Sequence, residues 1–395
     1  MMTTLLYVVL VLSLFAPIYT YVVYPFLLKA LSVFMKKDYK VDGNYRPLVS
    51  VLVAAYNEEK IIAEKILNLR QLDYPLDKIE FLIGSDGSSD RTIEIANSYL
   101  YIKNLRILDL PRSGKVNAIN SMLKEAKGEI LVFSDANTMY DTKAILNLVK
   151  YFTDDRIGCV SGQLRYKVDE SDGYGAKSES TYWRYENWVK VLESKVGRLS
   201  GANGAIYAIR KGIIDRIRKG IINDDFFIAT YVLQSGYDVI LETKAIAYEE
   251  PNSEFDSQFK RHIRDGAGHY QAIAVFWRMI LPRKGSFIHV SHRVIRWLVP
   301  FFLIIAFISN AVLLGEAMVM AGLFACQFLG YLVLFIYYLS VKKNEGSKTL
   351  VMDNKNVLSK LFSIVFYFYS VNLALLLGFF RLISRQQKAT WETQR

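Results

Sequence analysis

The sequence predicts an α/β domain combined with transmembrane helices. In the middle of the chain, short apolar runs alternate with segments that have the hydrophobic spacing of helices. Four other stretches, residues 5–34, 298–314, 317–341 and 361–380, are nearly free of charge. Each is about long enough to cross the roughly 30 Å of hydrocarbon in a bilayer. The composition agrees, because a chain of 395 residues that is 52% hydrophobic is too apolar for an ordinary soluble enzyme.

The middle of the chain is predicted to form the βαβ units of a Rossmann-like mixed sheet. Strands are expected at 49–54, 81–85, 106–110 and 130–133, and helices at 61–70, 92–99 and 116–125. Ligands of such sheets bind where the strands end and the loops begin. Polar residues just after each strand are therefore the first candidates for a functional site.

The first apolar stretch is predicted to be a retained membrane anchor, residues 1–35. It lacks a basic leader and is too long for a secretory signal peptide. Lys36, Lys37 and Lys40 follow it, and lysines at this point favour a cytoplasmic exit. We therefore expect a multi-pass protein of the plasma membrane whose domain at residues 36–276 lies in the cytoplasm.

The rest of the chain is expected to return to the membrane. Residues 277–297 mix basic and aromatic side chains with Pro282 and Gly285, which favours an interfacial amphipathic segment. About three spans are expected at 298–383, followed by a basic tail at 384–395. Three spans would place this tail outside, against the positive-inside tendency, unless the last segment is re-entrant or the tail is an exception.

The net charge of +11 points to membrane lipids rather than to nucleic acid. The basic residues gather beside the apolar spans, as in Arg278, Arg283, Lys284, Arg293 and Arg296. Anionic headgroups are the simpler partner for such a distribution, and no nucleic-acid module is recognisable. The two cysteines, Cys159 and Cys326, cannot build a disulfide framework or a cysteine metal site, which fits a reducing compartment.

Acidic residues follow the first two predicted strands. Tyr56 and Glu58 lie in the motif after the first strand, and Asp86 lies at the end of the second. A carboxylate only accepts hydrogen bonds, so Glu58 suits the hydroxyls of a ribose and Asp86 the imide N–H of uracil. Ser88 and Asp90, which come next, suit capping of the following helix equally well.

Two further motifs suit a diphosphate and its metal ion. Ser113-Gly114-Lys115 places free backbone N–H groups and a cation at a helix start, where phosphate oxygens bind, although a lysine there is often only solvated. Asp135 and Asn137 follow the fourth strand and can direct oxygens at one hard divalent cation. The alternative for this pair is an Asx-turn that ends the strand.

The second half of the domain contains candidates for catalysis and for acceptor binding. Asp224 and Asp225 are adjacent acids; one explanation is helix N-capping by Asp224, and the other is a general base, Asp225. The segment from Gln258 to Arg264 places amide and guanidinium groups on adjoining helical positions. They suit a pyrophosphate leaving group or an acceptor, although an isolated basic helix is usually surface.

In their order and spacing, these motifs resemble the membrane-embedded branch of the inverting family 2 glycosyltransferases. That branch includes hyaluronan, chitin-oligosaccharide, poly-N-acetylglucosamine and cellulose synthases. The resemblance covers about residues 48–268 and implies an A-type nucleotide-sugar glycosyltransferase fold with Mg²⁺ or Mn²⁺ as cofactor. It implies donor binding by Tyr56, Glu58, Asp86, Lys115, Asp135, Gln258 and Arg261, metal binding by Asp135 and Asn137, catalysis by Asp225 with Asp224 beside it, and acceptor binding by Gly204, His262 and Arg264.

Two positions depart from the pattern of this family. Asn137 stands where the metal motif usually ends in Asp, and an amide oxygen is a weaker ligand. His262 stands where the processive synthases have Trp in a Gln-x-x-Arg-Trp motif, which leaves open whether the product is a long polymer. The triplet ending in Asp225 also differs from the commoner Thr-Glu-Asp but keeps the final acid.

Together these features predict a membrane-bound inverting glycosyltransferase. It is expected to use a UDP-sugar, such as UDP-GlcNAc or UDP-glucose, to build a cell-surface polysaccharide or oligosaccharide. The alternatives are transfer of a single sugar to a lipid acceptor and a non-catalytic nucleotide-binding scaffold or transporter. Four spans are few for a secretion channel, so export of a long polymer would need a homo-oligomer or an export partner.

Overall fold

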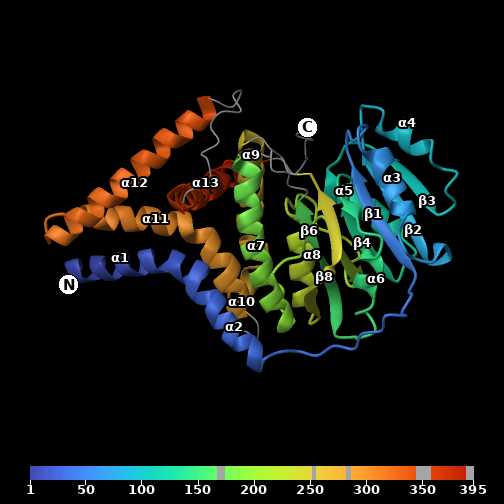
Figure 1. The fold of residues 1–395 in the computed structure, drawn as a ribbon, viewed down its shortest axis with the longest axis horizontal. Coiled ribbons are helices and arrows are strands. Elements are labelled where there is room, and N and C mark those ends of the chain that lie inside the picture. Colours follow the sequence, from blue (N-terminus) through green and yellow to red (C-terminus); the bar gives the residue numbers. More distant parts are fainter. Residues whose placement is uncertain (167–173, 251–254, 282–285, 344–356, 388–395) are drawn as a thin grey trace. The chain divides into compact units, whose positions relative to one another are not determined.

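The computed structural model describes residues 1–166, 174–250, 255–281, 286–343 and 357–387 (Figure 1). The chain divides into two compact units. Of the described residues, 31–166 and 185–250 form the sheet unit, and 1–30, 174–184, 255–281, 286–343 and 357–387 form the helical unit. Of the predicted segments, the basic tail beyond residue 387 and the stretch with Pro282, Arg283, Lys284 and Gly285 lie outside the described residues.

An eight-stranded mixed sheet organises the sheet unit, in the order β3-β2-β1-β4-β7-β6-β8-β5. Its strands are β1 Val49–Ala55, β2 Ile79–Asp86, β3 Leu105–Leu110, β4 Ile130–Asp135, β5 Met139–Tyr140, β6 Ile157–Tyr166, β7 Tyr207–Arg210 and β8 Asp238–Glu249. The first four are parallel and correspond to the four predicted strands. In the register, Ala54 of β1 lies opposite both Gly84 and Asp135, so the acids that end β2 and β4 lie at one edge.

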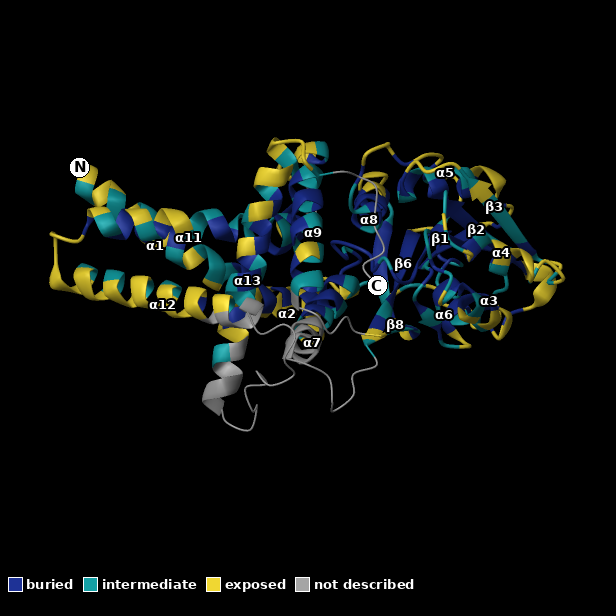
Figure 2. Ribbon diagram, turned by 90° about the horizontal axis from the view of Figure 1, so that it is seen from above, coloured by how far each residue is buried: buried dark blue, intermediate teal, exposed yellow. Residues whose placement is uncertain are grey.

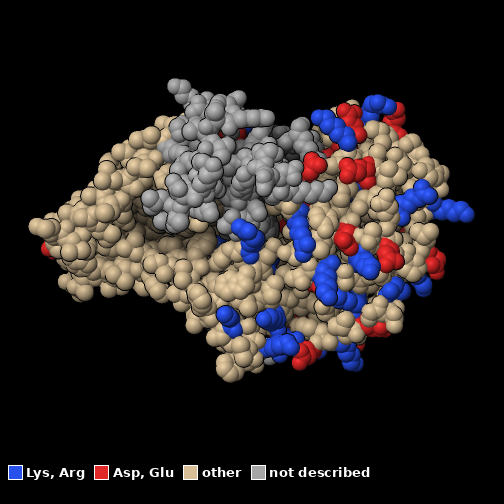
Figure 3. Space-filling view, in the orientation of Figure 1, with Lys and Arg blue, Asp and Glu red and all other residues tan. Residues whose placement is uncertain are grey.

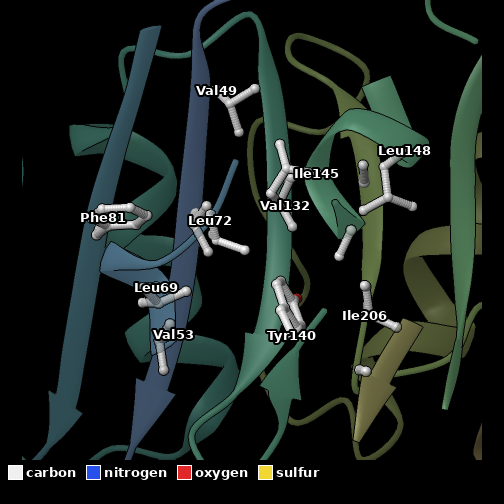
Figure 4. Close-up of a cluster of buried hydrophobic side chains, with 14 of the residues drawn as sticks. Val49, Val53, Leu69, Leu72, Phe81, Val132, Tyr140, Ile145, Leu148 and Ile206 are labelled. Atoms are coloured by element: carbon white, nitrogen blue, oxygen red, sulfur yellow. The ribbon is translucent and has the colours of Figure 1, made fainter. Parts of the chain in front are cut away.

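Helices cover both faces of the parallel half of this sheet. They include α3 Ile62–Arg70, α4 Thr92–Asn97 and α5 Lys115–Glu125. Next in the chain come α6 Ala144–Val149, α7 Tyr174–Lys195 and α8 Asp224–Gln234, of which α6 and α8 contact β6 and β8 in the other half of the sheet. Ile62, Ile66 and Leu69 of α3 join α6 in a core with alternate residues of β1 (Figure 4). On the opposite face α5 lies close to β2, since a side chain at Gly84 would meet Met122 at 3.1 Å. Every residue of β1 and β2 is buried, as expected for central parallel strands.

Among the described residues, four helices are long and apolar enough to cross a membrane, and they lie mostly in the helical unit. Their apolar segments are Met2–Phe34, Ser286–Val312, Met318–Ile336 and Ile364–Ile383. The second begins at Ser286 rather than at Leu298, because α10 Ser286–His289, a π-helical turn Val290–Val294 and α11 Ile295–Val312 follow one another without a break. α12 Met318–Lys343 is exposed along most of its described length (Figure 2), as is usual for a helix that contacts lipid or another subunit.

Arg296, one of the basic residues predicted to meet lipid headgroups, is instead buried within the helical unit. Arg296 is only 3% exposed, and its guanidinium lies 4.7 Å from the ring centre of Tyr21, which belongs to the π-helical turn Tyr19–Val23 after α1 Met2–Ile18. A cation over an aromatic face is stabilised by the electrons of the ring, so Tyr21 offsets part of the cost of burying this arginine. On the face drawn in Figure 3, charged side chains gather over the sheet unit.

Candidate active site

Asp86, at the end of β2, organises the loop that leads into α5. The carboxylate is fully buried and accepts hydrogen bonds from the backbone N–H groups of Ser113, at 2.7 Å, and Gly114, at 2.8 Å. It also forms an ion pair with Arg112. Gly87 makes this contact possible, because a side chain there would lie 2.5 Å from the backbone nitrogen of Arg112. Asp86 therefore shapes the predicted phosphate loop, in addition to the nucleoside role predicted for it.

Arg112 is a site residue that the sequence did not single out. Its guanidinium lies 3.3 Å from the ring centre of Tyr56, a predicted donor-binding residue. A cation this close to an aromatic face is held by the ring as well as by Asp86. The signal available in the sequence was its position immediately before Ser113-Gly114-Lys115, because cations beside phosphate loops often contact the ligand.

The loops after β1 and β2 hold each other in place. Ser88 Oγ accepts the Asn57 N–H at 3.1 Å, and Asp90 accepts the Glu59 N–H at 3.1 Å. Asp90 also accepts the N–H of Thr92 at 3.0 Å, but the N-cap of α4 is Arg91 and forms no side-chain cap hydrogen bond, so Ser88 and Asp90 join the two loops rather than cap this helix. Asn57 has a positive φ of 52°, a conformation rare outside Gly, Asn and Asp. These contacts fix the turn that carries Glu58, which is buried.

Lys115 connects the two acidic motifs. Its Nζ lies 2.8 Å from Asp135 Oδ1 and 3.3 Å from Asp224 Oδ1. Burial opposes the charged form of Lys115, but Asp135, Asp224 and Asp225 outweigh it and raise the pKa of the lysine above its ordinary value. Lys115 is therefore an ion-paired cation at the edge of the sheet, not a solvated lysine.

The structure rejects one alternative for Asp224. Helix α8 begins at Asp224 itself, its N-cap is Asn223, and no side-chain cap hydrogen bond is formed. Asp224 instead is buried and faces Lys115. An acid in the first turn still benefits from the helix dipole, so the pairing with Lys115 and the dipole together stabilise this carboxylate.

Asp225 lies against the small-residue turn that contains Gly204. A side chain on Gly204 would lie 3.1 Å from Asp225 Oδ2, so the carboxylate would have to shift by a few tenths of an ångström to admit one. Asp225 Oδ1 accepts the N–H of Phe226 at 2.7 Å. Gly204 therefore fixes the space around the predicted base.

Gly204→Ala is expected to lower kcat by up to about tenfold without unfolding the protein. The added methyl group must push Asp225 aside by a few tenths of an ångström, and misplacement of a catalytic group by about 1 Å costs roughly hundredfold. Steady-state kinetics with a thermal unfolding scan would check this. An unchanged kcat would show that the contact between Gly204 and Asp225 has no catalytic consequence.

The predicted metal pair has oxygens suited to a hard cation. Asn137 donates through Nδ2 to Glu249 of β8 at 2.7 Å, which leaves its amide oxygen for a ligand. Asp135 Oδ1 bonds to Lys115, and among the described residues Oδ2 accepts no hydrogen bond. Among the described residues, the Asp135 side chain forms no Asx-turn. These residues also contain no group of three His, Cys, Asp or Glu that could hold a metal ion by itself. A divalent ion would thus need diphosphate oxygens and water to complete its shell, which suits Mg²⁺ or Mn²⁺.

A buried lysine lies behind this pair. Lys65 of α3 is fully buried, and its Nζ donates to Ser134 Oγ at 2.7 Å and to the Thr138 carbonyl at 2.5 Å. The ring centre of Tyr140 lies 4.4 Å away. Burial lowers the pKa of Lys65 to about 7, although Asp135 opposes this shift.

The lowered pKa of Lys65 predicts that the folded protein gains stability as the pH rises above about 7. The unfolded chain keeps this proton up to its ordinary pKa of 10.5, whereas the folded protein releases it near pH 7. Stability rises wherever the unfolded state binds more protons, by on the order of 3 kcal/mol between about pH 7 and pH 9. The thermal unfolding midpoint in detergent should therefore rise with pH more for the wild type than for Lys65→Met. An equal rise in both proteins would contradict this prediction.

The remaining predicted residues belong to the helical unit, on α9 Phe255–Val275. Gln258 is buried, and His262 packs edge-on to Tyr367 of α13 Val357–Ile383 at 6.1 Å. Arg264 pairs with Asp265 at 3.4 Å. Burial opposes ionisation of Asp265, but Arg264, Arg261, His269 and His262 outweigh it and lower its pKa. The helix thus carries several basic side chains around Asp265. The assignment of Gln258, Arg261, His262 and Arg264 to donor and acceptor binding stays a prediction.

Comparison with known proteins supports the class that the motifs predict. Residues 50–217 match the family described as Glycosyl transferase family 2. The β-monoglucosyldiacylglycerol synthase of Trichormus variabilis is 27% identical over 246 residues, which are 60% of this chain and 52% of that protein. The poly-β-1,6-N-acetyl-D-glucosamine synthase of Staphylococcus epidermidis is 24% identical over 67% of this chain and 65% of its own length. The chain therefore spans about half of the first relative and less than two thirds of the second.

One solved structure resembles the fold closely. The mannosyltransferase PcManGT from Pyrobaculum calidifontis, solved with GDP-Man and Mn²⁺, gives a TM-score of 0.72 over 98% of this chain and 100% of its own, at 21% identity. This likeness confirms the predicted A-type α/β fold. Residues 50–217 of this chain therefore resemble family 2 glycosyltransferases, the class of enzyme that the motifs predicted.

Proposed function

We propose that this protein is a membrane-bound inverting glycosyltransferase that uses a nucleoside-diphosphate sugar. The donor is a UDP-sugar, UDP-GlcNAc or UDP-glucose, and the product is a cell-surface polysaccharide or oligosaccharide. The observation that carries this proposal is the convergence of Lys115, Asp135 and Asp224 at one edge of the sheet, with Asp225 next in the chain. A charge arrangement of this kind suits a diphosphate, a divalent cation and a general base together.

The nucleoside end of the donor is assigned to the loops after β1, β2 and β3. Tyr56 and Arg112 form a stacked pair that suits contact with a base, and Glu58 suits the ribose hydroxyls. Asp86 would then have two roles. It would bind the nucleoside, and it also holds the loop of Ser113 and Gly114 in place. This arrangement supports a nucleotide as the ligand without identifying the sugar.

The diphosphate is assigned to Lys115 and to a cation held by Asp135 and Asn137. A bound Mg²⁺ or Mn²⁺ would offset the negative charge that develops on the leaving nucleoside diphosphate. Lys115 adds a fixed positive charge at the same place. Arg261 and Gln258 keep the donor-binding role that the family resemblance implies for them. Stabilisation of the leaving group is expected to be the largest catalytic effect.

Asp225 is assigned the role of general base. It would remove the proton from the acceptor hydroxyl as the oxygen forms its bond to the anomeric carbon and the bond to the diphosphate oxygen breaks. Attack opposite to the leaving group inverts the anomeric configuration, so an α-linked donor gives a β-linked product. The buried neighbour Asp224 holds Lys115 rather than the acceptor, which separates the roles of the two acids.

A lipid acceptor is the second candidate, for two reasons. A relative with 27% identity is named as a synthase of a glucosyl lipid, and His262 stands where the resemblance expects the Trp of processive synthases. His262 and Arg264 on α9, with Gly204 in the sheet unit, are the proposed acceptor residues. A membrane lipid would then receive a single sugar.

The proposed membrane arrangement follows from the apolar helices and their flanking charges. Residues 1–35 would anchor the chain in the plasma membrane, 36–276 would form the cytoplasmic catalytic domain, 277–297 an interfacial segment, 298–383 the later spans and 384–395 a basic tail. Lys36, Lys37 and Lys40 support the cytoplasmic assignment. Membrane lipids are the expected surroundings, with oligomerisation or an export partner if the product is long.

Sizing the product tests the choice between polymer and lipid. Detergent-purified protein would be incubated with each UDP-sugar and with GDP-mannose, in the presence of oligosaccharide primers or membrane lipids. A ladder of saccharides supports the synthase, and one sugar on a lipid supports the second candidate. Nucleotide binding with no transfer to any acceptor would favour a non-catalytic scaffold.

A further inference from the structure

The turn that carries Asp135 and Asn137 is held from the core by the side chain of a buried lysine, Lys65. Residues 134–138 leave β4, and three hydrogen bonds converge on the Asp135 carbonyl, from Ser134 Oγ at 3.1 Å, Thr138 Oγ1 at 3.0 Å and Thr138 N–H at 3.4 Å. Ser134 and Thr138, at the two ends of this turn, are both buried. Lys65 Nζ bonds to both of them, so one ammonium group fixes both ends.

The position of Lys65 is costly for an ordinary structural lysine. It lies on the same face of α3 as Ile62, Ile66 and Leu69, in the apolar core. None of its hydrogen-bond partners in the described chain is a carboxylate. Removing an ammonium group from water without a paired anion is unfavourable, and an apolar side chain of the same size would avoid that cost. Residues that break a local rule in this way are concentrated at functional sites.

We propose that Lys65 is a positioning residue for the metal and diphosphate site. It acts through Ser134 and Thr138, which set the place of Asp135 and Asn137 before any ligand binds. The inference rests on the proposed function, because it concerns the metal pair assigned there. Groups behind metal ligands that fix their orientation typically change metal affinity 10- to 100-fold when they are removed.

The contacts of the turn explain why one lysine has this influence. Asn137 is held by Glu249 of β8, and Asp135 by Lys115 of α5, so both side chains have a fixed partner on one side. Lys65 adds the contact from α3, on the core side of the turn. Thr138 Oγ1 also lies 3.3 Å from the carbonyl of Ala205, which follows Gly204. The same turn therefore connects the metal pair to the loop beside Asp225.

The test compares Lys65→Met with a matched variant on the same helix. Asn68→Ala removes two hydrogen bonds between α3 and Tyr140, at 2.9 and 2.8 Å, just beyond the turn. Mn²⁺ would be titrated into each full-length protein with saturating UDP, and in a second series GDP, with free Mn²⁺ followed by electron paramagnetic resonance. Lys65→Met is expected to weaken Mn²⁺ binding about 10- to 100-fold, while Asn68→Ala binds Mn²⁺ as the wild type does.

A double variant identifies the route of the effect. If Lys65 acts through Ser134, adding Ser134→Ala to Lys65→Met costs little more Mn²⁺ affinity than the lysine change alone. Circular dichroism establishes that each variant is folded. Equal Mn²⁺ affinity in Lys65→Met and wild type would overturn the role of Lys65 and leave the proposed function intact. Absence of Mn²⁺ binding by the wild type with both nucleotides would overturn the metal assignment as well.

Discussion

Asp225→Asn should lower kcat by about 10²- to 10⁴-fold, with little change in the KM for the donor. A positioned general base contributes a rate factor of this size, and asparagine keeps the shape of the side chain while removing its ability to accept a proton. The amide oxygen of the substituted side chain would still accept the N–H of Phe226, so the start of α8 is expected to keep its structure. Steady-state kinetics on the purified protein, with donor binding measured separately, would separate these quantities.

Asp215→Asn provides the control for this change. It makes the same chemical substitution at an exposed position of the same unit and is expected to leave kcat unchanged. If Asp225→Asn retained wild-type kcat, another group would have to accept the proton. A rise in the donor KM with an unchanged kcat would instead assign Asp225 to binding.

Asp135→Asn is expected to have the second largest effect, a loss of about 10²- to 10³-fold in kcat/KM. The change removes the only carboxylate of the proposed metal pair and one of the two anions that hold Lys115. Stabilisation of the leaving group is then lost, and removal of one such contact typically costs this much. The enzyme should also lose most of its stimulation by Mg²⁺ or Mn²⁺.

A titration of activity against Mn²⁺ concentration would measure this effect. Asp141→Asn, in the turn that follows β5, is the matched control, because among the described residues the Asp141 carboxylate bonds only within its own loop, to the N–H of Lys143 at 3.0 Å. Unchanged metal dependence in Asp135→Asn would place the metal ion elsewhere or remove it from the reaction.

The parallel half of the fold could be predicted because its signals are local. Strands β1 to β4 and helices α3 and α5 coincide with the predicted segments within one or two residues, since each is a compact apolar or amphipathic run. β5, β6, β7 and β8 were not predicted. β5 and β7 are short and pair antiparallel with distant strands, and β6 and β8, although longer, pair with each other across a long stretch of the chain. Pairing of this kind depends on long-range contacts that a single segment does not contain.

The candidate site was predicted in part for the same reason. Asp86, Lys115, Asp135 and Asp225 occur in recognisable motifs, and all four lie in the sheet unit. The stacking of Arg112 on Tyr56 joins two loops that are distant in sequence. Lys65 was not predicted as a site residue, although its spacing from Ile62 and Leu69 placed it on the apolar face of α3. Its partners, Ser134 and Thr138, become visible only in the folded chain.

The most direct test of the central claim is release of nucleoside diphosphate from a panel of nucleotide sugars. Detergent-purified wild type and Asp225→Asn would be compared with Mg²⁺ or Mn²⁺ and after chelation, with membrane lipids added. The account predicts turnover of one donor by the wild type, which chelation and the substitution both abolish. Nucleotide binding without turnover of any donor would contradict it, and equal turnover by both proteins would remove Asp225 from the mechanism.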